Sequence, residues 1–127
     1  MAQKEQGKSD MNGWTDGIAY TDLTIVKNAY FNSGGHPASY NGWDRTGYVP
    51  CEGASSITFP PATGATAADL NQWSHWFDSA KQSLGKIVLS ATTTKTISVP
   101  ANAKYFGLST KSSSLTAVIN GGIVPHA

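Results

Sequence analysis

The sequence has a single cysteine and no long apolar run. Cys51 stands alone among 127 residues, which excludes an internal disulfide and argues against a cluster of thiolate metal ligands. We expect its thiol to be buried and to pack as a small apolar group. No stretch approaches the roughly 20 apolar residues that cross a bilayer, and residues 1–10 lack the apolar run of a secretory signal. The sequence therefore predicts no membrane partner.

Charge is scarce too. Charged residues make up 13% of the chain, the net charge is +1, and Arg45 is the single arginine. Nucleic-acid binding needs clustered lysines and arginines, so no nucleic-acid partner is expected. His36, His75 and His126 are far apart and share no metal-ligand spacing. We therefore expect no metal or cofactor, and we interpret these histidines as ordinary surface or loop residues.

Catalytic motifs are missing as well. The sequence contains no nucleophile elbow of the Gly-x-Ser-x-Gly type and no phosphate-binding loop. Asp44 with Glu52, or Asp69 with Asp78, could supply the carboxylate pair of a glycosidase. Nothing in their spacing favours this, and aspartate is common in turns. We predict that the chain is not an enzyme, and a glycan-degrading role ranks last among the alternatives.

Aromatic residues supply much of the apolar area. Four Trp, five Tyr and four Phe each remove about 150–250 Å² from water when buried. Residues 1–17 are polar and are predicted to be a flexible arm or linker, and residues 18–127 one all-β domain. Short β-branched and aromatic runs separated by turn residues indicate a sandwich or barrel. The expected strands lie within residues 23–31, 45–51, 55–59, 86–90, 94–99, 104–110 and 115–119.

Residues 67–84 give conflicting signals. Thr66 is a possible helix cap, and helical spacing is seen at Leu70, Trp73, Phe77, Ala80 and Leu84. The aromatic pair at residues 76–77, followed by Asp78 and Ser79, instead favours a strand that ends in a turn. On local residues alone, helix and strand both stay open.

Three blocks of sequence resemble a recurrent module of tailed-phage and prophage virion proteins. They are residues 41–50 (NGWDRTGYVP) with 55–59 (SSITF), residues 76–85 (WFDSAKQSLG) and residues 96–106 (TISVPANAKYF). In that family the order is Trp, Arg-Thr and Tyr-Ile-Pro-Val, then Tyr-Asp-x-x-Lys, then Val-Pro-x-x-Ala-x-Tyr. The resemblance covers about residues 28–112 and is moderately specific through the order of the blocks.

The resemblance implies a jelly-roll β-sandwich that is similar to carbohydrate-binding domains and occurs in tail fibres, baseplates and capsid-surface proteins. It also implies a strand ending in a turn at residues 76–78, which decides against the helix. One departure stands out, because the family often carries an arginine soon after the tyrosine of the third block. Here Phe106 and Gly107 follow that tyrosine, which puts a charged binding residue from this strand in doubt.

The candidate contact residues with a glycan or a partner are Trp14, Trp43, Asp44, Arg45 and Tyr48. Trp14 and Trp43 each follow an Asn-Gly pair, the strongest short hairpin signal, so a turn is expected at residues 41–42. An exposed aromatic ring beside amides is a usual grip on sugars. Large aromatics are mostly buried, however, which favours Trp43 as a plug at one end of the sandwich and Tyr48, Trp73 and Trp76 as core.

The expected function is that of a non-enzymatic virion structural protein, a capsid decoration or tail component made in the host cytoplasm. Its expected partners are other virion proteins and further copies of itself, commonly as a trimer by family analogy. The alternative is a dedicated carbohydrate-binding module that attaches to a host surface polysaccharide. Capsid and tail locations both stay open.

Overall fold

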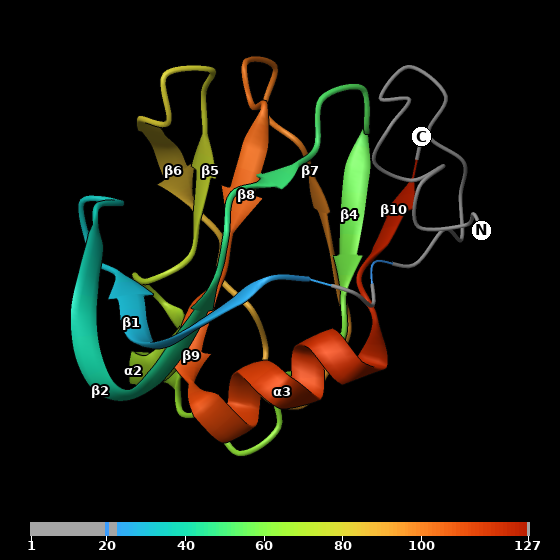
Figure 1. The fold of residues 1–127 in the computed structure, drawn as a ribbon. Coiled ribbons are helices and arrows are strands. Elements are labelled where there is room, and N and C mark those ends of the chain that lie inside the picture. The colour runs from blue at the N-terminus through green and yellow to red at the C-terminus, as the bar shows by residue number, and fades with distance from the viewer. Residues whose placement is uncertain (1–19, 21–22, 127) are drawn as a thin grey trace.

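The computed structural model describes residue 20 and residues 23–126; the expected arm at residues 1–17 and Trp14 lie outside the described residues. In the described chain, strand residues far outnumber helical residues, and the strands pair antiparallel (Figure 1). The chain is therefore mostly β, which is consistent with the predicted all-β class, and it also contains two helices. The strands are β1 (Ile25–Phe31), β2 (Pro37–Thr46), β3 (Val49–Pro50), β4 (Ser56–Phe59), β5 (His75–Phe77), β6 (Ser83–Lys86), β7 (Lys95–Ser98), β8 (Tyr105–Gly107), β9 (Ser109–Lys111) and β10 (Val124–His126), and the helices are α2 (Ala67–Leu70) and α3 (Ser112–Gly121).

The strands form three ladders, in the orders β1-β2-β9, β10-β4-β7 and β3-β8-β5-β6. The first and third ladders meet at a corner, where β2 leads into β3 and β8 leads into β9. At this corner the Thr46 N–H donates to the Leu108 carbonyl at 2.9 Å, and the Leu108 N–H donates to Thr46 Oγ1 at 3.0 Å. The threonine hydroxyl thus continues the ladder where the backbone bends, and the two strand pairs behave as one bent ribbon.

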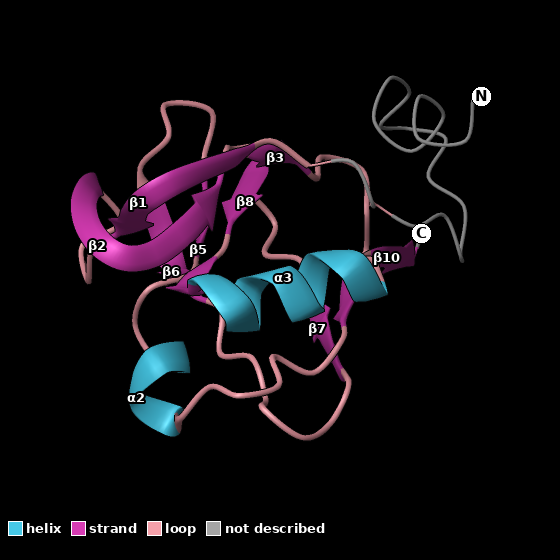
Figure 2. Cartoon of the chain, turned by 60° about the horizontal axis from the view of Figure 1, so that its bottom comes forward, coloured by secondary structure: helices cyan, strands magenta, loops and turns pink. Residues whose placement is uncertain are grey.

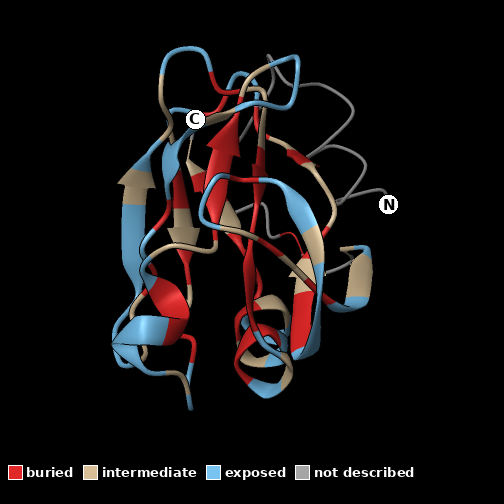
Figure 3. Cartoon of the chain, turned by 90° about the vertical axis from the view of Figure 1, so that its left-hand side faces the viewer, coloured by how far each residue is buried: buried red, intermediate tan, exposed pale blue. Residues whose placement is uncertain are grey.

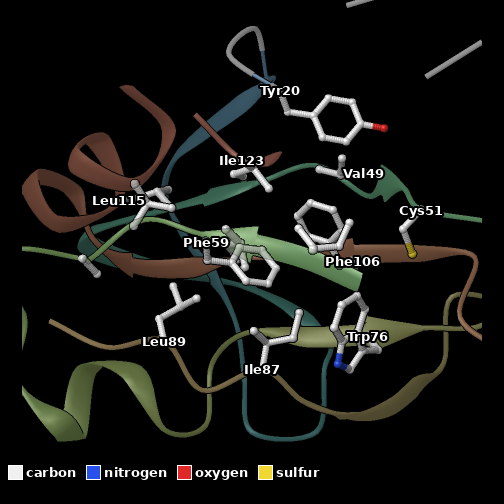
Figure 4. Close-up of a cluster of buried hydrophobic side chains, with 14 of the residues drawn as sticks. Tyr20, Val49, Cys51, Phe59, Trp76, Ile87, Leu89, Phe106, Leu115 and Ile123 are labelled. Atoms are coloured by element: carbon white, nitrogen blue, oxygen red, sulfur yellow. The ribbon is translucent and has the colours of Figure 1, made fainter. Parts of the chain in front are cut away.

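The core lies between two ladders (Figure 4). One side is the face formed by β3, β8 and β5, and the other side is β4 of the β10-β4-β7 ladder. Phe106 of β8 is fully buried, and its ring centroid lies 5.6 Å from that of Phe59 on β4 and 6.1 Å from that of Trp76 on β5. Tyr20 adds a third ring at 6.4 Å and donates its hydroxyl hydrogen to the Pro50 carbonyl at 2.8 Å. Side chains of separate ladders therefore share one aromatic core, on which the buried faces of the strands converge (Figure 3).

Two sequence predictions about this core are confirmed. Ile57 and Phe59 of β4 are fully buried, whereas Ser56 and Thr58 between them are half-buried, as the alternation of the strand predicts. Cys51 is fully buried as well. Burial, with a smaller effect of the Glu52 carboxylate, raises the pKa of its thiol to about 12, so the side chain stays neutral and packs as an apolar group.

Residues 112–121 form the helix α3, and the strand expected at residues 115–119 is wrong. Leu115, Val118 and Ile119 recur at i, i+3 and i+4, and this spacing places them on one helix face against the core. The serines at residues 112–114 form the first turn, where Thr116 Oγ1 donates to the Ser112 carbonyl at 2.8 Å. A β-branched run of this length is compatible with a strand or a helix. The helix is formed because α3 can then lie across one end of the core (Figures 1 and 2).

The ambiguous segment at residues 67–84 contains both structures. The helical spacing is realised over α2 alone, which Thr66 precedes as expected, with its N–H donating to the Asp69 carboxylate at 2.8 Å. The chain then enters β5, and Asp78 turns it by accepting the N–H groups of Ala80 and Gln82, each at 2.9 Å. The predicted strand that ends in a turn is confirmed. Trp76 lies on β5, which pairs with β8 on one side and β6 on the other, and this pairing requires extended backbone.

Other strand predictions differ from the structure in their bounds, and the strand expected at residues 45–51 is divided between the end of β2 and β3. β6 ends at Lys86, whereas the expected strand continued to residue 90. Ile87 and Leu89 are still buried and Val88 is 46% exposed, so the alternation persists after the ladder pairing has ended. The strand expected over residues 104–110 is divided into β8 and β9 at Leu108, the position of the corner.

Candidate functional site

The turn expected at residues 41–42 is not a turn, because Asn41 and Gly42 lie inside β2. The β1–β2 hairpin closes earlier, where the Gly35 N–H donates to the Asn32 carbonyl at 2.9 Å. The Asn32 side chain also accepts the Gly34 N–H at 2.9 Å. Residues 32–35 therefore make the hairpin turn, and the Asn-Gly pair at residues 41–42 serves another purpose.

That purpose is a bulge between β1 and β2. Residues 40–43 of β2 stand opposite Asn28 alone, because the pairing jumps from Asp44 to Ser39 across this point. Asn28 and Gly42 both have left-handed backbone, with φ of 55° and 87°, and Asn28 Oδ1 accepts the Gly42 N–H at 3.2 Å. Asparagine and glycine tolerate this conformation best. The Asn-Gly pair thus allows β2 to bulge and to bend as drawn in Figure 1.

The bulge gathers four aromatic side chains, Tyr30, Tyr40, Trp43 and Trp73, which we call the bulge aromatic group. The Tyr30 ring centroid lies 4.8 Å from that of Tyr40, 5.9 Å from that of Trp43 and 5.4 Å from that of Trp73. Trp43 is 8% exposed, whereas Tyr40 is 49% exposed. The structure therefore buries the tryptophan singled out by the sequence and exposes its neighbour Tyr40.

Polar contacts hold the bulge aromatic group at its edges. Trp73 Nε1 donates to the Ala68 carbonyl of α2 at 2.9 Å, and the Trp73 carbonyl accepts the Ser109 hydroxyl. On the β9 side, Ser112 Oγ donates to the Gly42 carbonyl at 3.2 Å. Contacts from α2, β9 and α3 thus fix the positions of the rings.

Asp44 is buried in the β1–β2 ladder beside the bulge. Its carboxylate lies 2.9 Å from Lys27 Nζ and accepts the Asn28 N–H at 3.2 Å. Burial alone raises the pKa of Asp44, but hydrogen bonds from Lys27, Asn28 and Ser112, together with the positive charge of Lys27, outweigh it and lower the pKa from its ordinary value. The carboxylate is therefore charged at neutral pH and stabilises the bulge from within, and the structure gives it an internal partner.

Tyr48 belongs to a second aromatic cluster, on which Arg45 packs. Its rings are Phe31, Tyr48, Phe77 and Tyr105, and we call it the motif aromatic group. The Tyr48 ring centroid lies 5.4 Å from that of Phe31, 4.9 Å from that of Phe77 and 6.2 Å from that of Tyr105. Two cations stack on these rings. Arg45 Cζ lies 4.9 Å from the centroid of the Phe31 ring. Lys81 Nζ lies 5.0 Å from the ring centroid of Tyr48 and 5.7 Å from that of Tyr105.

The structure thus separates the residues that the sequence placed together. Trp43 joins the bulge aromatic group, Arg45 and Tyr48 join the motif aromatic group, and Asp44 faces Lys27. Tyr40 was missed. Its position beside the Asn-Gly pair was no sufficient signal, because Trp43 on the other side of that pair is buried.

His75 is buried, and its assignment to the surface or to a loop is wrong. It lies in β5, where Nε2 is 2.9 Å from the Asn32 carbonyl and Nδ1 is 2.8 Å from Ser83 Oγ. A carbonyl only accepts, so Nε2 carries the hydrogen and Nδ1 accepts from the serine hydroxyl. Burial, together with repulsion from Lys86 and His36, lowers the pKa of His75 and outweighs the hydrogen bond to Asn32. The neutral imidazole therefore ties the hairpin turn to β5 and β6.

We expect this histidine to make the fold weaker in mild acid. Below the ordinary histidine pKa of 6.5, the unfolded chain binds a proton at this residue more readily than folded His75 does, so stability falls as the pH decreases, by at most about 1.4 kcal/mol per pH unit. Urea unfolding between pH 7.5 and 5 measures this slope, above the range in which Asp44 titrates. His75→Gln, as the control, should flatten the profile, and an equally steep profile in that variant would contradict the assignment.

The four carboxylates considered for catalysis all take part in local structure. Asp44 binds Lys27, Glu52 lies 2.8 Å from Lys104 Nζ, Asp69 accepts the Thr66 N–H, and Asp78 closes a turn. Within residues 20 and 23–126, no group of three or more His, Cys, Asp or Glu side chains is placed to hold a metal ion. None of the helices in that part of the chain has the length and apolar character needed to span a bilayer.

Comparison with known proteins finds no matching family model, no matching curated protein and no matching solved structure. Two aromatic groups stand out among the described residues. They differ in one respect that matters for binding. The motif aromatic group is covered by Lys81, which stacks on two of its rings, whereas the bulge aromatic group presents Tyr40 to solvent.

Proposed function

We propose that this chain is a non-enzymatic structural component of a tailed-phage virion, a surface-displayed jelly-roll sandwich that contacts neighbouring subunits. The observation that carries the proposal is the meeting of the three sequence blocks. Tyr48 of the first block packs on Phe77 of the second at 4.9 Å and on Tyr105 of the third at 6.2 Å. Lys81, also from the second block, lies over both tyrosine rings.

Residues of the three blocks also lie on neighbouring strands. β3, β8 and β5 follow one another in a single ladder, although they come from the first, third and second blocks. Residues that recur as a motif because they build one module are expected to touch, and these do. The shared core of β4 with β5 and β8 also suits a two-layer jelly roll, which we include in the proposal.

The proposal places the chain in the virion, among other virion proteins and further copies of itself, as a trimer by analogy with the family. Its non-enzymatic character is supported by the carboxylates, because those considered for catalysis are engaged by lysines or by backbone N–H groups. A general acid or base must instead reach a substrate.

A second candidate function is a carbohydrate-binding module that recognises a host surface polysaccharide. The observation that favours it is Tyr40, an aromatic ring that is 49% exposed and packs against the rings of Tyr30 and Trp43. Both functions are compatible within one virion protein, since a surface module can bind a neighbour on one face and a glycan on another.

The virion role predicts that the chain is present in purified particles. Particles of the phage that encodes it, purified by density gradient, are expected to contain its peptides in a fixed ratio to the major capsid protein when measured by quantitative mass spectrometry. An abundant lysate protein serves as the control and should decrease with each purification step. If the chain decreases in parallel with that control, the virion role is contradicted.

A further inference from the structure

We infer that the bulge aromatic group is a binding site for an uncharged glycan, with one sugar ring stacked on Tyr40. The inference rests on the glycan contact of the proposed function and gives it a place and a ligand class. Tyr40 is 49% exposed, and its ring centroid lies 4.8 Å from that of Tyr30 and 5.6 Å from that of Trp43. A ring supported in this way loses little conformational freedom when a ligand stacks on it.

The charges around the group select against an acidic ligand. Lys111 is the cross-strand partner of Trp43, and its Nζ lies 3.6 Å from the Asp69 carboxylate. Lys27, across from the other end of the bulge, binds Asp44 at 2.9 Å. Each of these lysines is thus paired with its own carboxylate, and the two pairs together carry no net charge. A polyanion gains little attraction at such a surface, because attraction of this kind depends on a cluster of unmatched cations.

Polar residues flank the exposed ring. Ser39 and Asn41, the neighbours of Tyr40 in the bulged strand, are both exposed. A hydroxyl and a primary amide offer donors and acceptors together, which suits the hydroxyl groups at the edge of a sugar ring stacked on Tyr40. The combination of one aromatic face with neutral hydrogen-bonding groups matches an uncharged carbohydrate.

The size of the apolar surface argues against a protein as the occupant of this site. One aromatic side chain contributes at most about 150–250 Å², whereas a standard protein interface buries about 800 Å² per partner. Within the described chain the other exposed large hydrophobic residues are Leu84 and Val88, which lie in or just after β6, in a different ladder. An isolated ring of this area corresponds to one sugar ring.

The test is a titration of the full chain, followed by tryptophan fluorescence, because Trp43 and Trp73 pack in the same group as Tyr40. The probes are maltohexaose, cellohexaose and chitohexaose as neutral oligosaccharides, and oligogalacturonate as the acidic one. We expect saturable binding of at least one neutral probe, a loss of affinity of at least tenfold in Tyr40→Ala, and near-normal affinity in Tyr40→Trp. Val88→Ala, which removes a similarly exposed side chain elsewhere, is the matched control and should bind as the wild type does.

Three results would overturn the inference: no neutral probe binds, oligogalacturonate binds more tightly than the neutral probes, or Tyr40→Ala binds unchanged. Thermal unfolding of each variant shows that the fold is retained, since Tyr40 lies at the surface. The virion role is tested separately. A chain that is present in particles but binds no neutral glycan contradicts only the glycan site, and one that binds but is absent from particles contradicts only the virion role.

Discussion

Replacing Phe106 with alanine is expected to destabilise the protein by about 4 kcal/mol, the cost typical of removing a buried phenylalanine ring. Phe106 is fully buried, and it contacts Tyr20, Phe59 and Trp76, with centroid distances of 5.6 to 6.4 Å. Phe106 therefore joins the β3-β8-β5-β6 ladder to the β10-β4-β7 ladder through its contact with Phe59 of β4. The cavity left by alanine would open between the two, where backbone strands on both sides limit relaxation.

Urea unfolding followed by far-ultraviolet circular dichroism and by tryptophan fluorescence measures this effect. Phe106→Leu keeps most of the volume and should cost well under half as much, whereas Val88→Ala, at an exposed position, should change the free energy of unfolding little. Both probes should report one transition, because the ladders share a core. Two separate transitions in the wild type, or a loss below about 1 kcal/mol in Phe106→Ala, would show that this ring does not join the ladders.

The second large effect is expected at Gly107, where alanine should cost about 3 kcal/mol. A Cβ added at this position would lie 2.3 Å from Phe31 Cε2 and 2.7 Å from Phe31 Cζ, so either the ring or strand β8 must move. Phe31 is itself fully buried, packed on Phe77 at 5.1 Å and on Tyr48 at 5.4 Å. The displacement therefore spreads through the motif aromatic group.

Gly47→Ala is the matched control for Gly107→Ala. An added Cβ at Gly47 meets nothing within 4 Å, so that variant should unfold close to the wild type. The double variant Phe31→Leu with Gly107→Ala should lose less free energy of unfolding than the two single variants lose together, because the smaller side chain at position 31 relieves the clash. Strict additivity of the two free-energy changes would contradict a direct contact between Phe31 and Gly107.

Gly107 also explains why this strand carries no charged residue directly after Phe106. A Cβ at this position would lie 2.3 Å from Phe31 Cε2, so the Phe31 ring leaves no room for a side chain. The cations of the motif aromatic group come from elsewhere, from Arg45 on β2 and from Lys81 in the turn after β5. Lys81 has left-handed backbone with φ of 63°, in a turn whose N–H groups are bound by Asp78.

The sequence by itself determined the features that depend on neighbouring residues. Alternation predicted the buried face of β4, the β-branched run predicted β1, and a lone cysteine in a weakly charged chain predicted a buried thiol. These predictions succeed because strand alternation and side-chain hydropathy are local properties. The prediction of β5, which ends just before the turn at Asp78, depended on the resemblance of residues 76–85 to the phage module. The local spacing of apolar residues allowed a helix as well.

Only the tertiary structure decided the features that depend on partners distant in sequence. The Asn-Gly pair makes a bulge and not a turn because Asn28, fourteen positions away, accepts the Gly42 N–H. Residues 115–119 are helical because the end of the core has to be covered, and His75 is buried because Asn32 and Ser83 satisfy both of its nitrogens. The exposure of Tyr40 in place of Trp43 follows from that same bulge. Left-handed backbone is available to any Asn-Gly pair, and the strand that pairs with it determines which neighbouring ring reaches solvent.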